Sequence, residues 1–344
     1  MARAIAVTEV PSWTDPVAGF LWYGFKMLGT KIMLSGIKPT GDLHVGNYFG
    51  AMRQFVEFAN AGEHQVFVMV ADYHALNFIQ DAEQMRKLTQ ELVMGYLAAG
   101  LDPKKVTLFK QSEVPAHTEL AWIFETITTM PYLMRAHAFK DAEAKNKEIS
   151  AGTFNYPMLM ATDILLYDAD IVPVGQDQKQ HIEYARDTAE KFNRTFKTEL
   201  FKLPEAYIKP EVAIVPGTDG QKMSKSYKNV IPLFGSEEEV TKAVMSIVTD
   251  SSGDRPENVY AIHKLVRSET ELSSIYETNR GNYKALKEAL AKDLNQFLEP
   301  LHKRYAELQS DPSIVESVLL EGRREARAVT EAKMQAVREA IGVA

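Results

Sequence analysis

A short segment near residue 40 carries the residue types that bind phosphate groups. It reads Pro39-Thr40-Gly41-Asp42-Leu43-His44-Val45-Gly46-Asn47. His44 and Asn47 can donate hydrogen bonds to phosphate oxygens, and Gly46 lets a ring or a ribose approach the backbone because it has no side chain. A helix that begins near Gly46 would also direct backbone N–H groups and its positive dipole end toward an anion. The alternative is a glycine-containing turn in which the histidine and the asparagine are incidental.

A second candidate for phosphate binding is the run Lys222-Met223-Ser224-Lys225-Ser226. It follows the turn-forming residues 216–220, so it is expected on a loop. Two lysines three residues apart can neutralise a triphosphate, and the serine hydroxyls add hydrogen bonds. By charge alone the run would be an ordinary surface loop, but as a literal string of five residues it is very specific.

A third set of residues points to an aromatic ligand. Tyr156, Met160 and Asp163 stand at positions i, i+4 and i+7 of a helical stretch, so they share one face. A methionine packs well against ring edges, and a carboxylate can accept a hydrogen bond from a ring N–H. The alternative is an ordinary core helix, but a buried aspartate there would need a partner of its own.

Short apolar runs alternate with amphipathic stretches around these segments. The runs are 32–34, 66–71, 106–109 and 171–174, and the stretches of helix length include 46–60 and 82–99. Continuous runs of this kind fit strands buried on both faces, so the alternation predicts an α/β fold with a doubly wound parallel sheet. Ligands of such sheets bind beyond the carboxyl ends of the strands. We therefore expect residues 35–36, 72–74 and 175–178 to converge on one crevice.

Composition excludes several classes of function. The chain has 344 residues, is 45% hydrophobic, carries a net charge of -7 and contains no cysteine. Without cysteine there are no disulfides, no Cys nucleophile and no iron–sulfur cluster. No apolar run approaches the roughly 18 residues that a membrane span needs. The acidic total argues against a protein that coats nucleic acid non-specifically.

The chain changes character along its length. Residues 1–30 have no clear period, and we interpret them as an extension, unstructured or upstream of the true start, with no assigned function. Residues 31–234 hold the alternating pattern and both phosphate-binding segments. Residues 235–344 are dominated by helical patterns, and Ser236 with Glu239 fits a capping box. The last of these helices alternates basic residues with glutamates, which is typical of a solvent-facing charged surface.

Together the two phosphate-binding segments resemble the HIGH and KMSKS motifs of class I aminoacyl-tRNA synthetases. KMSKS is matched letter for letter at 222–226, and HIGH occurs as His44-Val45-Gly46-Asn47, a form familiar in the tryptophanyl branch. The stretch 152–181 also resembles tryptophanyl-tRNA synthetases, and the resemblance extends from about Ile32 to the C-terminus. It implies a Rossmann-like class I catalytic domain at 31–234 and a helical anticodon-binding domain at 235–344.

The resemblance also implies roles for particular residues. The catalytic residues would be His44, Asn47, Lys222 and Lys225. ATP would be bound by Lys38, Pro39, Thr40, His44, Gly46, Asn47, Gly175, Gln176, Asp177, Ile214, Lys222, Met223, Ser224, Lys225 and Ser226. Tryptophan would be bound by Leu34, His74, Tyr156, Met160, Asp163 and Gln178. Within these sets Asp163 would recognise the indole nitrogen, Asp177 the ribose of ATP, and Ile214 the adenine. Mg²⁺ would bind through the ATP phosphates, and no residue is expected to hold a metal of its own.

Three positions depart from the family pattern. Many bacterial members have glutamine where Lys38 stands and an aromatic residue where Leu34 stands. A lysine found in some members corresponds here to Ala142, and Lys145 or Lys147 is a candidate replacement. His74 has an alternative interpretation as a crevice histidine without a role in binding.

The implied function is that of a tryptophan–tRNA ligase, which forms tryptophanyl-adenylate from ATP and L-tryptophan and transfers the amino acid to tRNA(Trp). By the same resemblance the protein is expected to be a cytoplasmic homodimer that does not bind membranes. The apolar stretch 121–139, with Trp122, Phe124, Tyr132, Leu133 and Met134, is a candidate dimer surface or, alternatively, ordinary core.

Three other functions remain to be weighed. A tyrosyl-tRNA synthetase is disfavoured by Met160, where that family typically has glutamine, and by the GxDQ sequence at 175–178. A nucleotidyltransferase with related phosphate binding is disfavoured by KMSKS and by the helical C-terminal part. A non-catalytic paralogue is disfavoured by the intact set of motifs.

Overall fold

The computed structural model describes residues 30–144, 148–175, 179–207, 215–249 and 255–344. Its contacts divide the chain into two compact units. The larger one consists of Lys31–Ile214 and Pro300–Ala344, and the smaller one contains Val215–Glu299. This division by contacts differs from the functional boundary expected at residue 234, which stays a prediction. No helix in the described ranges has the length and apolar character needed to cross a bilayer.

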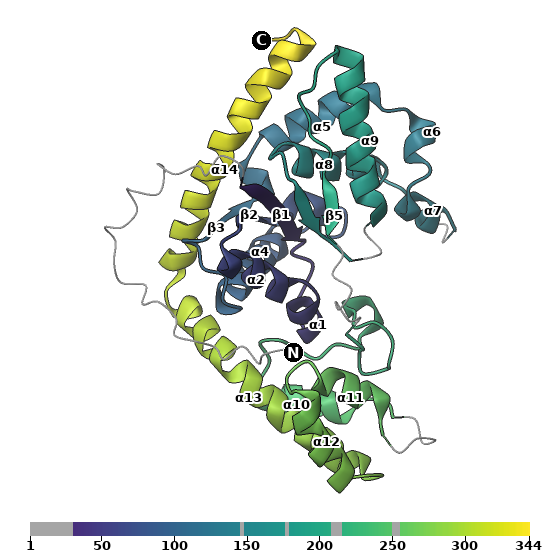
Figure 1. The fold of residues 1–344 in the computed structure, drawn as a ribbon, viewed down its shortest axis with the longest axis vertical. Coiled ribbons are helices and arrows are strands. Elements are labelled where there is room, and N and C mark those ends of the chain that lie inside the picture. Colours follow the sequence, from purple (N-terminus) through teal and green to yellow (C-terminus); the bar gives the residue numbers. More distant parts are fainter. Residues whose placement is uncertain (1–29, 145–147, 176–178, 208–214, 250–254) are drawn as a thin grey trace. The chain divides into compact units, whose positions relative to one another are not determined.

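The larger unit is built on one parallel sheet, seen near the centre of Figure 1. Its strands are β1 (Lys31–Ile37), β2 (His64–Val70), β3 (Val106–Lys110), β4 (Ile171–Pro173) and β5 (Glu205–Tyr207). The order across the sheet is β3-β2-β1-β4-β5, and every pairing is parallel. This confirms the predicted doubly wound sheet. Four of the strands match the apolar runs, whereas β5 was not predicted because its three residues form no apolar run.

Burial explains why the strands read as continuous apolar runs. The last five residues of β2 and the first four of β3 are buried, so the side chains on both faces of these strands face protein. Branched and aromatic residues suit such positions, because they pack well on a pleated surface. The first strand lies in the middle of the sheet and pairs with β2 along its whole length.

Helices surround the sheet. They are α1 (Val45–Asn47), the π-helical η3 (Tyr48–Met52), α2 (Arg53–Ala61), α3 (Asp72–Ala75), α4 (Ala82–Ala98), the 3₁₀ turn η4 (Gln111–Glu113), α5 (Ala116–Ile127), α6 (Met130–Leu133), α7 (His137–Ala144), α8 (Ala151–Leu165) and α9 (Lys179–Phe196). The helices predicted at 46–60 and 82–99 are confirmed, apart from the π-helical turn in the first. Glycine ends α4 as expected, since Gly100 has a φ of 102° that other residues rarely adopt.

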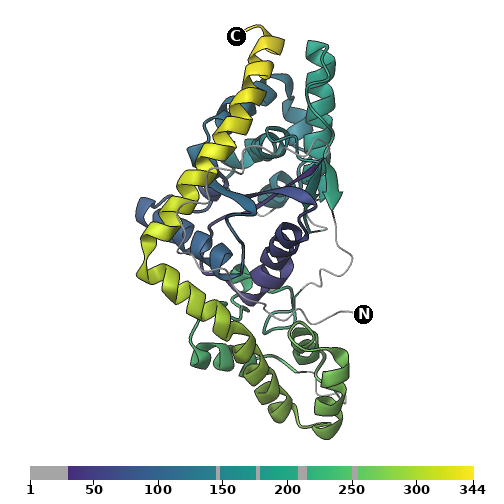
Figure 2. The ribbon, with the colours of Figure 1, turned by 60° about the vertical axis from the view of Figure 1, so that its left-hand side comes forward.

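The last helix, α14 (Pro312–Ile341), packs along the larger unit beside β3, as Figure 2 shows. A Cβ atom at Gly322 would lie 1.8 Å from the carbonyl oxygen of Leu108, so the helix and the strand touch backbone to backbone. Three basic residues of α14 bind partners within the same unit: Arg327 donates to the Glu113 carbonyl, Lys333 to Asp168, and Arg338 to both carboxylate oxygens of Glu119. The predicted solvent-facing charged surface is therefore present only in part: Arg324, Glu331 and Glu339 are exposed, whereas Lys333 and Arg338 are half-buried against the body of the unit.

The smaller unit is helical. It contains the 3₁₀ turn η6 (Lys225–Tyr227), α10 (Glu237–Met245), α11 (Glu257–His263), α12 (Glu269–Thr278) and most of α13 (Tyr283–Ser310). The capping box of Ser236 and Glu239 begins α10 as predicted. A buried histidine connects three of the helices, because His263 contacts Tyr276 at 3.3 Å and Asp293 at 3.0 Å.

Candidate active site

The first phosphate-binding segment connects β1 to a continuous helical path. Backbone angles remain right-handed helical from α1 through η3 into α2, so the path begins at Val45, one residue before the predicted start. His44 is the extended residue that precedes it. The Asn47 Oδ1 atom accepts a hydrogen bond of 3.0 Å from the backbone N–H of His44. The Asn47 amide oxygen is thereby used locally, and its NH₂ group is the part that can donate to an anion.

Lys38 lies where the strand ends and has an aromatic neighbour. Its Nζ atom lies 4.8 Å from the ring centroid of Phe78, which is 69% exposed. Such a cation–π contact holds an ammonium group near the surface without neutralising its charge. Pro39 is buried and Thr40 half-buried, and the Thr40 N–H donates to the Lys38 carbonyl at 2.8 Å.

The carboxyl ends of the strands converge as predicted. The Ser35 hydroxyl donates to the Pro173 carbonyl at 3.3 Å, which joins the ends of β1 and β4. Asp72, two residues after the end of β2, accepts hydrogen bonds from the backbone N–H and the hydroxyl of Ser112, two residues after the end of β3. Gly175 follows β4 by two residues and is exposed. The described strand ends therefore lie together at this edge of the sheet, and the crevice expected there stays a prediction, since residues 176–178 lie outside the described ranges.

The Asp163 carboxylate lies in this region and is 3% exposed. Its Oδ1 atom accepts from Gln111 Nε2 at 2.7 Å and from His117 Nδ1 at 2.6 Å. Its Oδ2 atom accepts from His74 Nε2 at 2.8 Å. A carboxylate can accept about four hydrogen bonds, so among the described residues one acceptor position, on Oδ2, is left for a ligand.

The electrostatics keep Asp163 ionised. Burial by itself would raise the pKa of this carboxyl group, but the hydrogen bonds from His117 and His74 outweigh burial and lower the pKa below its usual range. Burial raises the pKa of Tyr156 to about 12 and holds the pKa of Tyr167 well above its ordinary value, so both phenol groups are neutral. The site thus presents one negative charge among hydroxyl and imidazole groups.

The other residues predicted to bind an aromatic ligand lie near this carboxylate or in the core beneath it. The Tyr156 ring lies 6.2 Å from the His74 ring, and its hydroxyl is 2.9 Å from Nε2 of His181. Met160 is half-buried against the main core. Leu34 is almost completely buried in that core. The structure thus brings Tyr156, His74 and Asp163 together, while ligand contacts of Met160 and Leu34 stay predictions.

The KMSKS segment lies in the smaller unit and is organised by Asn229. The Asn229 Oδ1 atom accepts from the Ser224 N–H at 2.7 Å, and its Nδ2 atom donates to the Lys222 carbonyl and to Asp219. Met223 is 4% exposed. Its side chain therefore anchors the loop, and its backbone N–H donates to the Val215 carbonyl at 2.9 Å. Lys222 and Ser226 are exposed, and Ser224 and Lys225 are half-buried.

Some predicted residues cannot be placed. Gln176, Asp177, Gln178 and Ile214 lie outside the described residues, as do Lys145 and Lys147. Their roles stay predictions.

Four residues of this region were not predicted: Gln111, His117, Tyr167 and Asn229. The first two follow β3 in the string Gln111-Ser112-Glu113-Val114-Pro115-Ala116-His117. Polar residues directly after an apolar run were the signal used for the other strands, and the same signal would have identified Gln111. His117 and Tyr167 gave no such signal, because neither stands at the carboxyl end of a predicted strand.

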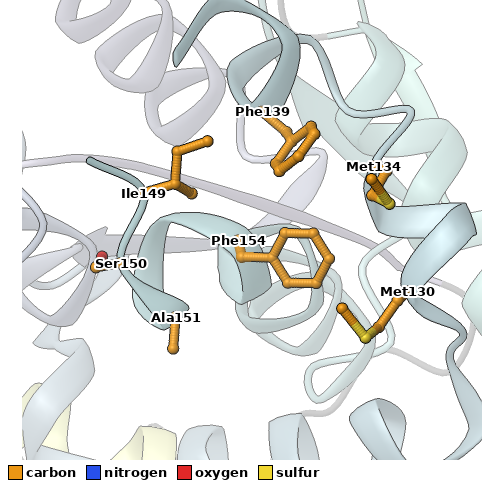
Figure 3. A pocket seen from close by; sticks show the side chains of 7 residues that line it. All are labelled: Met130, Met134, Phe139, Ile149, Ser150, Ala151 and Phe154. Carbon is orange, nitrogen blue, oxygen red and sulfur yellow. The ribbon is translucent and has the colours of Figure 1, made fainter. Parts of the chain in front are cut away.

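A separate apolar pocket lies beside α6, α7 and the start of α8 (Figure 3). It is lined by Met130, Met134, Phe139, Ile149, Ser150, Ala151 and Phe154. The pocket overlaps the predicted dimer surface 121–139, which the structure divides in two. Phe124 and Leu133 are buried in the core, whereas Trp122 is 68% exposed and Met134 44% exposed.

Comparisons with known proteins place this geometry in context. The chain matches the family described as "tRNA synthetases class I (W and Y)" over residues 29–308. It is 43% identical to a tryptophan–tRNA ligase of Fusobacterium nucleatum, over 91% of this chain and 98% of that protein. A tryptophanyl-tRNA synthetase of Campylobacter jejuni, solved with ADP and tryptophan, is 41% identical with a TM-score of 0.84, over 90% of this chain and 99% of that one. A tyrosyl-tRNA synthetase of Archaeoglobus fulgidus, at 22% identity and a TM-score of 0.64, shares the fold.

Proposed function

The chain belongs to the class I tRNA synthetases for tryptophan and tyrosine, and from this premise we propose that it is a tryptophan–tRNA ligase. One observation carries the choice of amino acid. The chain matches, along nearly its whole length, a tryptophanyl-tRNA synthetase that was solved with ADP and tryptophan. The tyrosyl member is a much more distant relative.

Tryptophan recognition is assigned to the Asp163 carboxylate. An indole ring has one polar hydrogen, and the remaining acceptor position on Oδ2 matches it in number and in charge. A tyrosine hydroxyl could also donate one hydrogen to this acceptor, so the choice of tryptophan rests on the comparison with the tryptophanyl enzyme. Tyr156 and His74 supply the neighbouring aromatic and polar contacts, and Gln178 is expected to bind the amino acid.

In the first step the tryptophan carboxylate attacks the α-phosphorus of ATP. A C–O–P bond forms, the bond to the β-phosphate oxygen breaks, and pyrophosphate leaves. The substrate itself is the nucleophile, so the protein contributes positioning and charge stabilisation. We assign phosphate binding to Asn47, His44 and Lys38. The Asn47 side chain uses its oxygen in the local hydrogen bond with the His44 N–H, so its NH₂ group is the part that would donate to a phosphate.

The second set of phosphate ligands is the KMSKS segment. Lys222 and Lys225 would stabilise the departing pyrophosphate, with Ser224 and Ser226 as donors. Mg²⁺ would enter with the substrate, bound to the phosphates of ATP. It would stabilise the negative charge that develops on the leaving pyrophosphate. In the described ranges no group of three or more His, Asp or Glu side chains is arranged to hold a metal ion.

In the second step a terminal ribose hydroxyl of tRNA(Trp) attacks the activated carboxyl group and releases AMP. We propose that the helical C-terminal part reads the anticodon, and that the protein works as a cytoplasmic homodimer. The exposed Trp122 and Met134 support the predicted dimer surface, because exposed large apolar groups commonly mark interfaces.

The test is ATP–pyrophosphate exchange with each of the twenty amino acids, followed by charging of tRNA(Trp). We expect exchange with tryptophan alone and charging of that tRNA. Exchange with tyrosine in place of tryptophan would identify a tyrosyl enzyme. Absence of exchange with every amino acid would identify a non-catalytic relative.

A further inference from the structure

A buried chain of polar groups lies behind Asp163 and has no part in the proposed chemistry. His117, on α5, places Nδ1 2.6 Å from Asp163 Oδ1 and Nε2 3.0 Å from the Tyr167 hydroxyl. The side chains of His117 and Tyr167 are almost completely buried. The rings of Phe67 and Phe109 pack against Tyr167 at centroid distances of 5.1 and 5.3 Å. This environment is apolar, so each hydrogen in the chain needs a partner within it.

The donors and acceptors of these side chains determine the direction of the hydrogen-bond chain. The Asp163 carboxylate can only accept, so His117 Nδ1 carries the hydrogen between them. Among the described residues, Nε2 of His117 is the acceptor within reach of the Tyr167 hydroxyl. That hydroxyl retains its proton, because burial raises its pKa. The chain therefore runs from Tyr167 O–H to His117 Nε2 and from His117 Nδ1–H to Asp163 Oδ1, with His117 as its neutral Nδ1–H tautomer.

The chain also determines which acceptor on Asp163 remains for a ligand. The hydrogen bonds from His117 and Gln111 use both lone pairs of Oδ1. They prevent the carboxylate from rotating about its Cβ–Cγ bond, because rotation would break two short hydrogen bonds in a buried place. The remaining lone pair then stays on Oδ2, beside His74.

We propose that His117 and Tyr167 are positioning residues for amino-acid specificity: their hydrogen-bond chain holds the Asp163 carboxylate so that its one remaining acceptor faces the ring N–H of tryptophan. The proposal rests on the proposed function. Neither residue touches the substrate, so both act through Asp163.

Two substitutions at one position separate the two hydrogen bonds of His117. In His117→Asn the side-chain NH₂ group takes the place of Nδ1 and still donates to Asp163. In His117→Gln the amide reaches the place of Nε2, so the Tyr167 contact can survive but the donor to Asp163 is lost. Tyr167→Phe removes the hydroxyl alone. The protein offers a matched control in the smaller unit, where a similar hydrogen-bonded set consists of Tyr276, His263 and Asp293. Tyr276→Phe removes the corresponding hydroxyl there.

The readout compares tryptophan with its isostere in which sulfur replaces the ring N–H. For each variant kcat/KM is measured with both amino acids by ATP–pyrophosphate exchange. We expect His117→Gln to lose about 10- to 100-fold with tryptophan, the size of a hydrogen bond to a charged group, and much less with the isostere. His117→Asn and Tyr167→Phe keep a donor to Asp163 but lose the Tyr167 contact, so each should lose less of the ratio than His117→Gln does, and Tyr276→Phe should not change it. An equal loss with both amino acids, or equal ratios for the Asn and Gln variants, would overturn the proposal in favour of a structural role.

A spectroscopic measurement tests the hydrogen-bond chain independently of any activity assay. Nitrogen-15 NMR of the histidine rings, with His117 assigned through His117→Asn, should show the neutral Nδ1–H tautomer in the wild type and a changed Nε2 shift in Tyr167→Phe. An Nε2–H tautomer, or an imidazolium at neutral pH, would refute the chain even in an enzyme that activates tryptophan. Failure of the wild type to activate tryptophan would instead refute the proposed function.

Discussion

The substitution Asp163→Asn tests tryptophan recognition most sharply, because it keeps the shape of the side chain. The asparagine oxygen should take the place of Oδ1, where donors from Gln111 and His117 converge. Its NH₂ group then takes the place of Oδ2, beside His74. One of its hydrogens would point to the position proposed for the indole N–H, so a donor would meet a donor.

The magnitude follows from two losses. A hydrogen bond to a charged group contributes about 1.5–3 kcal/mol, and leaving a buried N–H without an acceptor costs about 1–3 kcal/mol more. Together they predict a loss in kcat/KM with tryptophan of about 10²- to 10⁴-fold. The sulfur isostere has no N–H to lose, so its kcat/KM should fall by less than about tenfold.

The assay is ATP–pyrophosphate exchange with both amino acids, accompanied by thermal unfolding of each variant. Asp293→Asn is the matched control, because Asp293 also accepts from a buried histidine but lies in the smaller unit. Its ratio of tryptophan to isostere should equal that of the wild type. If Asp163→Asn lowers both activities by the same factor, the carboxylate supports the fold and does not recognise the ring nitrogen.

Three further predictions concern the phosphates, the fold and pH. Lys222→Ala and Lys225→Ala should each lower pyrophosphate exchange by at least about 100-fold, since each removes a cation that stabilises the departing pyrophosphate. Tryptophan affinity measured by equilibrium binding should change by less than about threefold. Near wild-type exchange in both variants would reject the assignment. Gly322→Ala should destabilise the protein by about 3 kcal/mol in denaturant unfolding, because its Cβ would lie 1.8 Å from the Leu108 carbonyl oxygen; unchanged stability would show that α14 does not pack there. The lowered pKa of Asp163 means that its contribution to stability and binding is complete above the ordinary aspartate pKa and is lost only as the pH falls through the lowered value. Tryptophan selectivity over the isostere in equilibrium binding should therefore be constant between about pH 8 and about pH 5, and a decline within that range would contradict a lowered pKa.

Local patterns in the sequence predicted the strands that have a run of apolar residues, and with them the meeting of the described strand ends at one edge of the sheet. The strand β5 was missed because Glu205–Tyr207 is only three residues long and begins with a glutamate. The π-helical turn at Tyr48–Met52 has no signature in the spacing of Phe49, Met52 and Phe55, which also fits a regular helix.

The residues proposed to contact the ligands could be predicted from the sequence, but the residues that hydrogen-bond to them and hold them in place could not. Asp163 was recognised because a carboxylate on an apolar helix face needs a partner, and the structure supplies three. Two of those partners, Gln111 and His117, come from another strand end and another helix. Their place beside Asp163 depends on how α5 packs against α8, which no local pattern specifies. Asn229 was missed for a similar reason, since it acts on the KMSKS loop from outside the motif.

The same holds for α14, whose alternating charges predicted a solvent-facing surface. Part of this surface is exposed, but Arg327, Lys333 and Arg338 also bind partners that are distant in sequence. A charge pattern indicates that a helix face is polar, but it does not say whether water or another element faces it.

The most direct measurement is a crystal structure of the protein with tryptophan and a non-hydrolysable ATP analogue. We predict the indole nitrogen within hydrogen-bonding distance of Asp163 Oδ2, and the phosphates of the analogue at His44 and at the Asn47 amide. An indole nitrogen that faces any other group, or phosphates bound away from residues 38–47, would contradict the account.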